Sequence, residues 1–222
     1  IINQKKLLKQ VYIDYYFELK KKCQDNAKII EIGSGAGFLK KIIPSVITTD
    51  IINIPDIDTV CSAYNLPFKN ESADVVFLMN TLHHLNTPSN FFLEVLRCLK
   101  SDGKAIMIEP ANTILSSFVY KNFHHEPFDL NWNWNERITK TDNNFSNQAI
   151  PWIIFIRERK KFEKLFFNLK IKEIKIHTPL RYLLSGGLTK SNLIPEYFCS
   201  IIKNIEKIIT PLNTILGMFM TI

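Results

Sequence analysis

The chain has 222 residues, of which 46% are hydrophobic, and a formal net charge of +7 at pH 7. This length suits one well-buried α/β domain with an added subdomain and is too short for two full domains. The basic residues fall in scattered groups, which indicates solvated helix faces and argues against a nucleic-acid partner.

Four cysteines stand far apart, without a C-x-x-C pair or a matching histidine spacing. We therefore expect a reducing, cytoplasmic compartment and no structural zinc. The sequence has no run of 18 apolar residues, which argues against a transmembrane helix. Because the sequence begins at Ile1, a targeting segment ahead of it is left open.

The first half of the chain predicts a helix followed by a parallel sheet. Residues 1–27 carry apolar side chains at helical spacing with lysines around them, which indicates a leading amphipathic helix. Short apolar segments rich in β-branched residues then predict five strands, at 28–32, 46–50, 58–61, 74–79 and 104–109. A helical pattern begins at Phe38, whereas the interval after Asp50 is too short for a helical crossover and predicts a loop.

A second helix is predicted over 88–100, with Thr87 as N-cap and Pro88 at its first position, and Ser101-Asp102-Gly103 is predicted to turn the chain into the next strand. The pattern then loosens. We expect a core over 28–110, a lid or insertion over 111–168, and late strands with a C-terminal helix over 169–222. The expected fold is a Rossmann-like α/β domain with a seven-stranded, mostly parallel sheet flanked by helices.

The run EIGSGAG at residues 31–37 is the most informative motif of the chain. Its glycines let the main chain approach a nucleoside closely. In the dinucleotide fingerprint G-x-G-x-x-G the third glycine would fall at position 38, which is Phe38 here. The spacing G-x-G-x-G, with Glu31 two places ahead, resembles the first motif of class I S-adenosylmethionine-dependent methyltransferases.

Four further segments resemble the same family, in the branch that includes the ubiquinone and menaquinone biosynthesis methyltransferases. They are Asp50 at the end of the second strand, SAYNLPF (62–68), NTLHHL (80–85) and LKSDGKAIMIEP (99–110). Each is a weak signal, but five motifs in sequence order over residues 28–110 are a strong one. One departure is Ser62, which stands where the family's adenine segment has an aspartate.

The resemblance implies S-adenosylmethionine as cofactor and assigns roles to individual residues. Glu31, Gly33, Ser34 and Gly35 would organise the turn and the methionine end, and Asp50 would bind both ribose hydroxyls. Ser62 and Ala63 would face adenine with Ile51 as an apolar neighbour, and Asn80 would lie beside the methionine moiety.

Methyl transfer needs few catalytic side chains, because the protein chiefly positions donor and acceptor in a dry pocket. If the acceptor must lose a proton, histidine suits the task, and we predict His84 and His125 as catalytic residues. The alternative is that His83 and His84 only pack and cap a helix. His124, His125, Glu126 and Asp129 in the expected lid are candidates for acid/base or metal chemistry, but no metal is expected, since the adjacent His124 and His125 make poor joint ligands for a tetrahedral ion.

The acceptor is predicted to be a small molecule, or a lipid- or glycan-related one that is partly apolar. Trp132 and Trp134 are interpreted either as part of its pocket or as ordinary core. The apolar face of the tail helix, residues 198–209, either packs on the domain or contacts a membrane. Two other functions stay open: a scaffold without catalysis, and a nicotinamide-dependent oxidoreductase, against which Phe38 argues.

Overall fold

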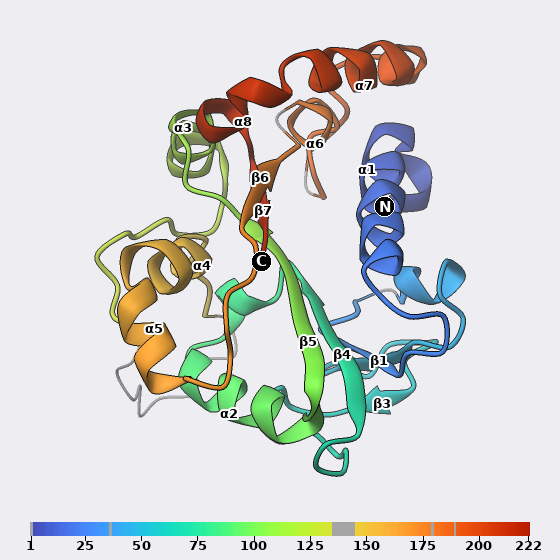
Figure 1. The fold of residues 1–222 in the computed structure, drawn as a ribbon. Coiled ribbons are helices and arrows are strands. Elements are labelled where there is room, and N and C mark those ends of the chain that lie inside the picture. Colours follow the sequence, from blue (N-terminus) through green and yellow to red (C-terminus); the bar gives the residue numbers. More distant parts are fainter. Residues whose placement is uncertain (1, 36, 135–144, 179, 189) are drawn as a thin grey trace.

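The computed structural model describes residues 2–35, 37–134, 145–178, 180–188 and 190–222. In this part of the chain a seven-stranded sheet has the order β3-β2-β1-β4-β5-β7-β6 (Figure 1). Neighbouring strands are parallel except where β7 pairs with β5 and β6. The strands are β1 (Ile29–Ile32), β2 (Ile47–Asp50), β3 (Thr59–Val60), β4 (Ala73–Met79), β5 (Leu99–Pro110), β6 (Lys175–His177) and β7 (Phe219–Thr221). The predicted fold class is confirmed.

Helices cover both faces of this sheet (Figure 1). The α-helices are α1 (Lys6–Lys21), α2 (Pro88–Cys98), α3 (Ile114–Phe123), α4 (Ile150–Trp152), α5 (Arg159–Leu165), α6 (Arg181–Leu184), α7 (Cys199–Ile208) and α8 (Asn213–Leu216). Short 3-10 helices lie at Ile2–Gln4, Phe38–Lys41, Leu82–His84, Glu196–Phe198 and Thr210–Leu212, and a π-helix spans Ile153–Arg157.

Two hydrophobic clusters follow from the alternation of side chains along the strands. In β4, Val76 and Leu78 belong to the cluster that includes α2 and α5, whereas Val75 and Phe77 belong to the cluster under α1. The leading helix is confirmed, and its apolar face is buried against the sheet as its spacing predicted.

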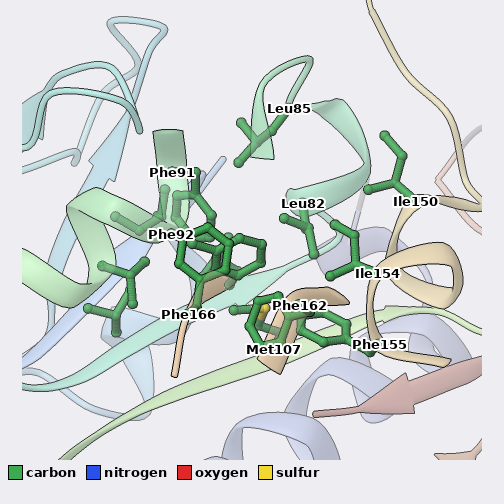
Figure 2. Packing of buried hydrophobic residues seen from close by; sticks show 14 of the residues in the cluster. Leu82, Leu85, Phe91, Phe92, Met107, Ile150, Ile154, Phe155, Phe162 and Phe166 are labelled. Atoms are coloured by element: carbon green, nitrogen blue, oxygen red, sulfur yellow. The ribbon is translucent and has the colours of Figure 1, made fainter. Parts of the chain in front are cut away.

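The cluster on the α2 face is rich in phenylalanine (Figure 2). Phe92 of α2 lies 5.9 Å from Phe155 and 5.0 Å from Phe162, measured between ring centroids. Trp134 is fully buried there, and its Nε1 donates to the Glu158 carboxylate at 2.9 Å. Part of the interval 111–168 therefore completes the core, and Trp134 is a core residue.

Two local predictions were wrong. The helical pattern at Phe38 forms only the 3-10 helix Phe38–Lys41, because Pro44 disfavours helical backbone just before it. The predicted turn at 101–103 lies inside β5. There Ala73 pairs with Leu99 and Val75 with Lys104, so the extra residues bulge out of the ladder between these pairs.

The C-terminal segment enters the sheet as β7, between β5 and β6. Met218, Phe219 and Met220 are each at most 2% exposed, so the apolar end of the chain is core. Among the described residues, no helix combines the length and the hydropathy that crossing a membrane requires.

Candidate functional site

The glycine turn after β1 has the left-handed backbone that its glycines permit. Gly33, Gly35 and Gly37 have φ values of 69°, 52° and 62°. A Cβ on Gly33 would lie 2.5 Å from Thr81 Oγ1, so the chain itself requires glycine there. A Cβ on Gly35 would meet no atom within 4 Å, so only open space lies beside this residue. A ligand at Gly35 could therefore approach the main chain closely, with no side chain in between.

Two buried oxygen atoms without a hydrogen-bond partner lie at the ends of neighbouring strands. Glu31 Oε2 belongs to β1, and Asn80 Oδ1 to the residue that directly follows β4. Burial, together with the charge of Asp50, raises the pKa of Glu31 to about 8. The sheet order reverses between β1 and β4, which is where open α/β sheets bind ligands. Both oxygens are acceptors, so they suit a ligand that brings donors.

The other predicted cofactor residues surround this turn. Ser34 Oγ accepts from the Thr49 N–H at 3.1 Å, and Asp50 accepts from the N–H groups of Gly35 and Ile52, each at 2.9 Å. Each carboxylate oxygen of Asp50 has capacity for a further donor. Ile51 is 67% exposed and therefore free to cover a flat ring.

Ser62 and Ala63 lie farther along the same edge of the sheet. Ser62 Oγ accepts from the Tyr64 N–H at 3.2 Å, and Ala63 packs partly buried against the core of the α2 face. The roles of these residues toward the cofactor stay predictions.

A cavity of about 700 Å³ begins at Asn80 and extends under α3 and α6. Its wall is mainly apolar, with Leu115, Phe118, Phe123 and Leu193 among the lining residues. Its polar residues include His83, His84, His124, His125, Glu126 and Gln148. One end of the cavity is therefore lined by histidines, and the remainder of its wall is apolar.

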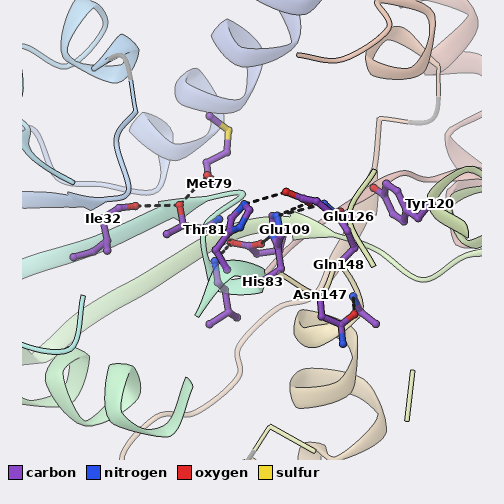
Figure 3. Close-up of polar contacts among 12 residues, drawn as sticks. Ile32, Met79, Thr81, His83, Glu109, Tyr120, Glu126, Asn147 and Gln148 are labelled. Carbon is purple, nitrogen blue, oxygen red and sulfur yellow. Dashed lines mark hydrogen bonds and ion pairs between the residues drawn. The ribbon is translucent and has the colours of Figure 1, made fainter. Parts of the chain in front are cut away.

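His83 lies buried at this polar end of the cavity (Figure 3). Its Nδ1 lies 2.7 Å from Glu109 Oε2, and Glu109 Oε1 accepts the N–H groups of Thr81 and Leu82 at 2.8 Å each. Burial disfavours the imidazolium, but Glu109 and Glu126 outweigh burial and raise the pKa of His83 to about 9. The expectation that one histidine of the pair is packed inside the protein is met by His83.

The Glu126 carboxylate lies among three of these histidines. Its oxygens lie 3.6 Å from His83 Nε2, 3.5 Å from His84 Nε2 and 3.9 Å from His125 Nε2. His84 is 45% exposed at its side chain, and burial and the charge of His83 lower its pKa. The two predicted catalytic histidines, His84 and His125, are thus brought to one carboxylate from segments about 40 residues apart in the chain.

The sequence assigned no role to Glu109 or Gln148, although both complete this polar end. Glu109 falls within the motif of residues 99–110 and is fully buried at the end of β5. Its place before Pro110 at the end of a predicted strand was the available signal for a site residue. Its histidine partner, His83, lies 26 residues earlier and could not be inferred from that signal. Trp134 is buried in the core and does not line this cavity, so of its two interpretations the core one holds.

Comparisons with known proteins agree with this arrangement. A family model described as "Methyltransferase domain" matches residues 30–107. The chain is similar to a candidate methyltransferase of Haloferax volcanii, solved in complex with the methyltransferase activator Trm112. That match has 16% identity and a TM-score of 0.50, and covers 90% of this chain and 82% of the other. No curated protein matches the chain.

Two further solved structures match a shorter part of the chain. One is a SAM-dependent methyltransferase from Thermotoga maritima, with 23% identity and a TM-score of 0.46, over 50% of this chain and 58% of that one. The other is a candidate methyltransferase from Bacillus halodurans C-125, with 20% identity and a TM-score of 0.39, over 49% and 56%. The chain thus spans little more than half the length of these two structures.

The glycine turn, the sheet order and the domain match agree with one another. Residues 30–107 match a methyltransferase domain and lie within a seven-stranded sheet of the class I methyltransferase fold.

Proposed function

We propose that this chain transfers a methyl group from S-adenosylmethionine to a small, partly apolar acceptor, lipid- or glycan-related molecules included. One observation carries the proposal: Asn80 contributes an unpartnered buried oxygen at the strand ends and also lines the apolar cavity. A donor bound at the turn and an acceptor bound in the cavity would therefore meet at this residue.

The residues at the turn fit the cofactor. Its methionine part carries an ammonium group, for which Glu31 Oε2 and Asn80 Oδ1 are acceptors without another partner. Asp50 retains acceptor capacity for ribose hydroxyls, and Gly35 leaves space beside the backbone. When bound, the sulfonium supplies an electrophilic methyl group.

The chain's own residues then have to orient the acceptor and exclude water. The apolar wall formed by Leu115, Phe118 and Phe123 supports a partly apolar acceptor. His84 and His125 line the same cavity, and we keep them as the residues that face the reacting group. This wall belongs to residues 111–168, which stay our candidate lid.

Calorimetric titration with S-adenosylmethionine, its demethylated product and a nicotinamide dinucleotide tests the proposal. We expect saturable binding of the first two and none of the third. Absence of binding to all three at millimolar concentration would favour the scaffold function. Mass spectrometry of molecules that co-purify with the protein would then give the acceptor class.

We further propose that the protein contacts a membrane surface, from which an apolar acceptor enters the cavity. Ile201, Ile205 and Ile208 lie on one face of α7 and are 53%, 38% and 77% exposed. Phe118 and Phe123 of α3 are more than half exposed and also line the cavity. In Figure 1, α3, α8 and α7 lie along one end of the molecule. The exposed phenylalanines of α3 therefore belong both to this end of the molecule and to the wall of the cavity.

Flotation with vesicles of phosphatidylcholine and phosphatidylserine tests this contact. Replacing Ile201 and Ile208 together by glutamate should abolish flotation, because it removes apolar area and adds repulsion from anionic lipid. Leu93→Glu on α2 is the matched control, since Leu93 is 58% exposed outside this surface. Equal flotation of both variants, or none of the wild type, would contradict the membrane contact. Deletion of the tail is unsuitable because β7 is part of the sheet.

A further inference from the structure

We propose that His83, His84 and Glu126 bind a divalent transition-metal ion, with zinc as the preferred ion. This goes beyond methyl transfer, and its test measures metal binding directly. The proposal rests on the geometry of the three side chains, on the groups that hold them in place, and on their position at the cavity.

The three residues place their ligand atoms at the separations a metal requires. One ligand atom from each lies within 4.8 Å of the others. Glu126 lies 3.6 Å from His83 Nε2 through Oε2 and 3.5 Å from His84 Nε2 through Oε1. Tetrahedral zinc, with bonds of about 2.0 to 2.2 Å, separates its ligand atoms by roughly 3.4 Å. Small rotations of the rings would therefore complete the site.

The adjacent histidines of the lid, His124 and His125, were expected to be poor joint ligands, and the same objection to His83 and His84 is met by their local backbone. His83 and His84 belong to the 3-10 helix Leu82–His84, and their ring centroids lie 4.3 Å apart. Both rings present Nε2 to the same carboxylate of Glu126, which comes from the loop after α3. The third ligand thus comes from a distant part of the chain.

A second layer of contacts fixes the buried ligand. His83 Nδ1 contacts Glu109 Oε2 at 2.7 Å, and both side chains are at most 3% exposed. Glu109 is itself held by two backbone N–H groups through its other oxygen (Figure 3). A carboxylate behind a ligating histidine is the usual arrangement in zinc sites, where it orients the ring and fixes the tautomer.

The charges and the surroundings of the site also suit a cation. Glu109 and Glu126 bring two carboxylates to His83, and both would offset the charge of a divalent ion that replaced the proton on His83 Nε2. Gln148 Nε2 lies 3.4 Å from His83 Nε2 and also donates to Glu126, so Gln148 now contacts the two atoms that the ion would join.

All three ligands line the cavity. A set of two histidines and one glutamate leaves a coordination position open, as in catalytic rather than structural zinc sites. That position would take an oxygen or nitrogen atom of a molecule bound in the cavity.

Titration with Co²⁺ tests the site, followed by displacement with Zn²⁺. Protein freed of metal by a chelator should bind one Co²⁺ per chain with a visible absorption band, and Zn²⁺ should abolish that band. His84→Ala and Glu126→Gln should each weaken binding more than about 100-fold, since even outer contacts of a metal site contribute 10- to 100-fold. Circular dichroism melting of each variant verifies that it is folded.

His125→Ala is the matched control. His125 lies in the same loop as Glu126, but its side chain is 64% exposed and its Nε2 is 3.9 Å from the carboxylate. This variant should keep one ion per chain with affinity within a few-fold of wild type. The proposal is wrong if the wild type binds no Co²⁺, if His84→Ala binds as wild type, or if His125→Ala alone abolishes binding.

Discussion

Replacing Gly35 by alanine is expected to weaken the binding of S-adenosylmethionine by roughly 10- to 100-fold while the protein stays folded. The added methyl group meets no protein atom within 4 Å, so its cost to the fold is limited to the strain of the positive φ, but it enters the space beside the turn that the cofactor would occupy. An overpacked contact costs about 1 to 3 kcal/mol, and each 1.4 kcal/mol is tenfold in affinity. Isothermal titration calorimetry measures this change.

Gly37→Ala is the control for Gly35→Ala. Gly37 also has positive φ, so alanine has the same backbone cost there, of about 1 to 2 kcal/mol, and its nearest neighbour would be Asp56 O at 3.6 Å. If both variants lose affinity equally, backbone strain explains the loss. If Gly35→Ala binds as tightly as wild type, the cofactor does not lie over this turn.

The second large effect is a pH dependence of stability that comes from Glu31. Its pKa is raised to about 8 in the folded protein, so between its usual range and pH 8 the folded state keeps a proton that the unfolded state has lost. The free energy of unfolding should therefore fall as pH rises through this interval, by up to about 1.4 kcal/mol per pH unit from this group. Urea denaturation at several pH values between 5 and 8.5 measures the slope.

Glu31→Gln should remove this part of the slope, because glutamine cannot titrate. S-Adenosylmethionine should flatten the wild-type slope as well, since a positively charged ligand beside Glu31 favours the ionised carboxylate. If wild type and Glu31→Gln show the same slope, Glu31 does not keep its proton in the folded protein. A flattening by cofactor in Glu31→Gln would place the linkage at another group.

Much of the cofactor domain could be predicted from the sequence because its signals are local. The strands β1, β2 and β4 are short apolar segments bounded by polar residues, and the turn after β1 is specified by glycines that tolerate positive φ. The amphipathic spacing of α1 likewise indicates which face is buried. These features depend on residues within a few positions of one another.

The later part of the chain was harder to predict because its contacts are distant. The apolar C-terminal residues 218–222 fit a membrane contact and a buried strand equally well by composition, and only pairing with β5 and β6 makes them β7. The pattern at Phe38 suggested a helix, but Pro44 and the short path to β2 leave room for one 3-10 turn.

The sequence by itself determined the sheet of the first 110 residues, the glycine turn and the type of domain, since periodicity, turn residues and motif spacing are encoded locally. Only the tertiary structure decided that His83, Glu109 and Glu126 share one site and that this site opens into an apolar cavity. The physical reason is that these residues are 17 to 43 positions apart. Strand ends and a loop bring their charges together, and no local sequence pattern predicts that these residues are close in space.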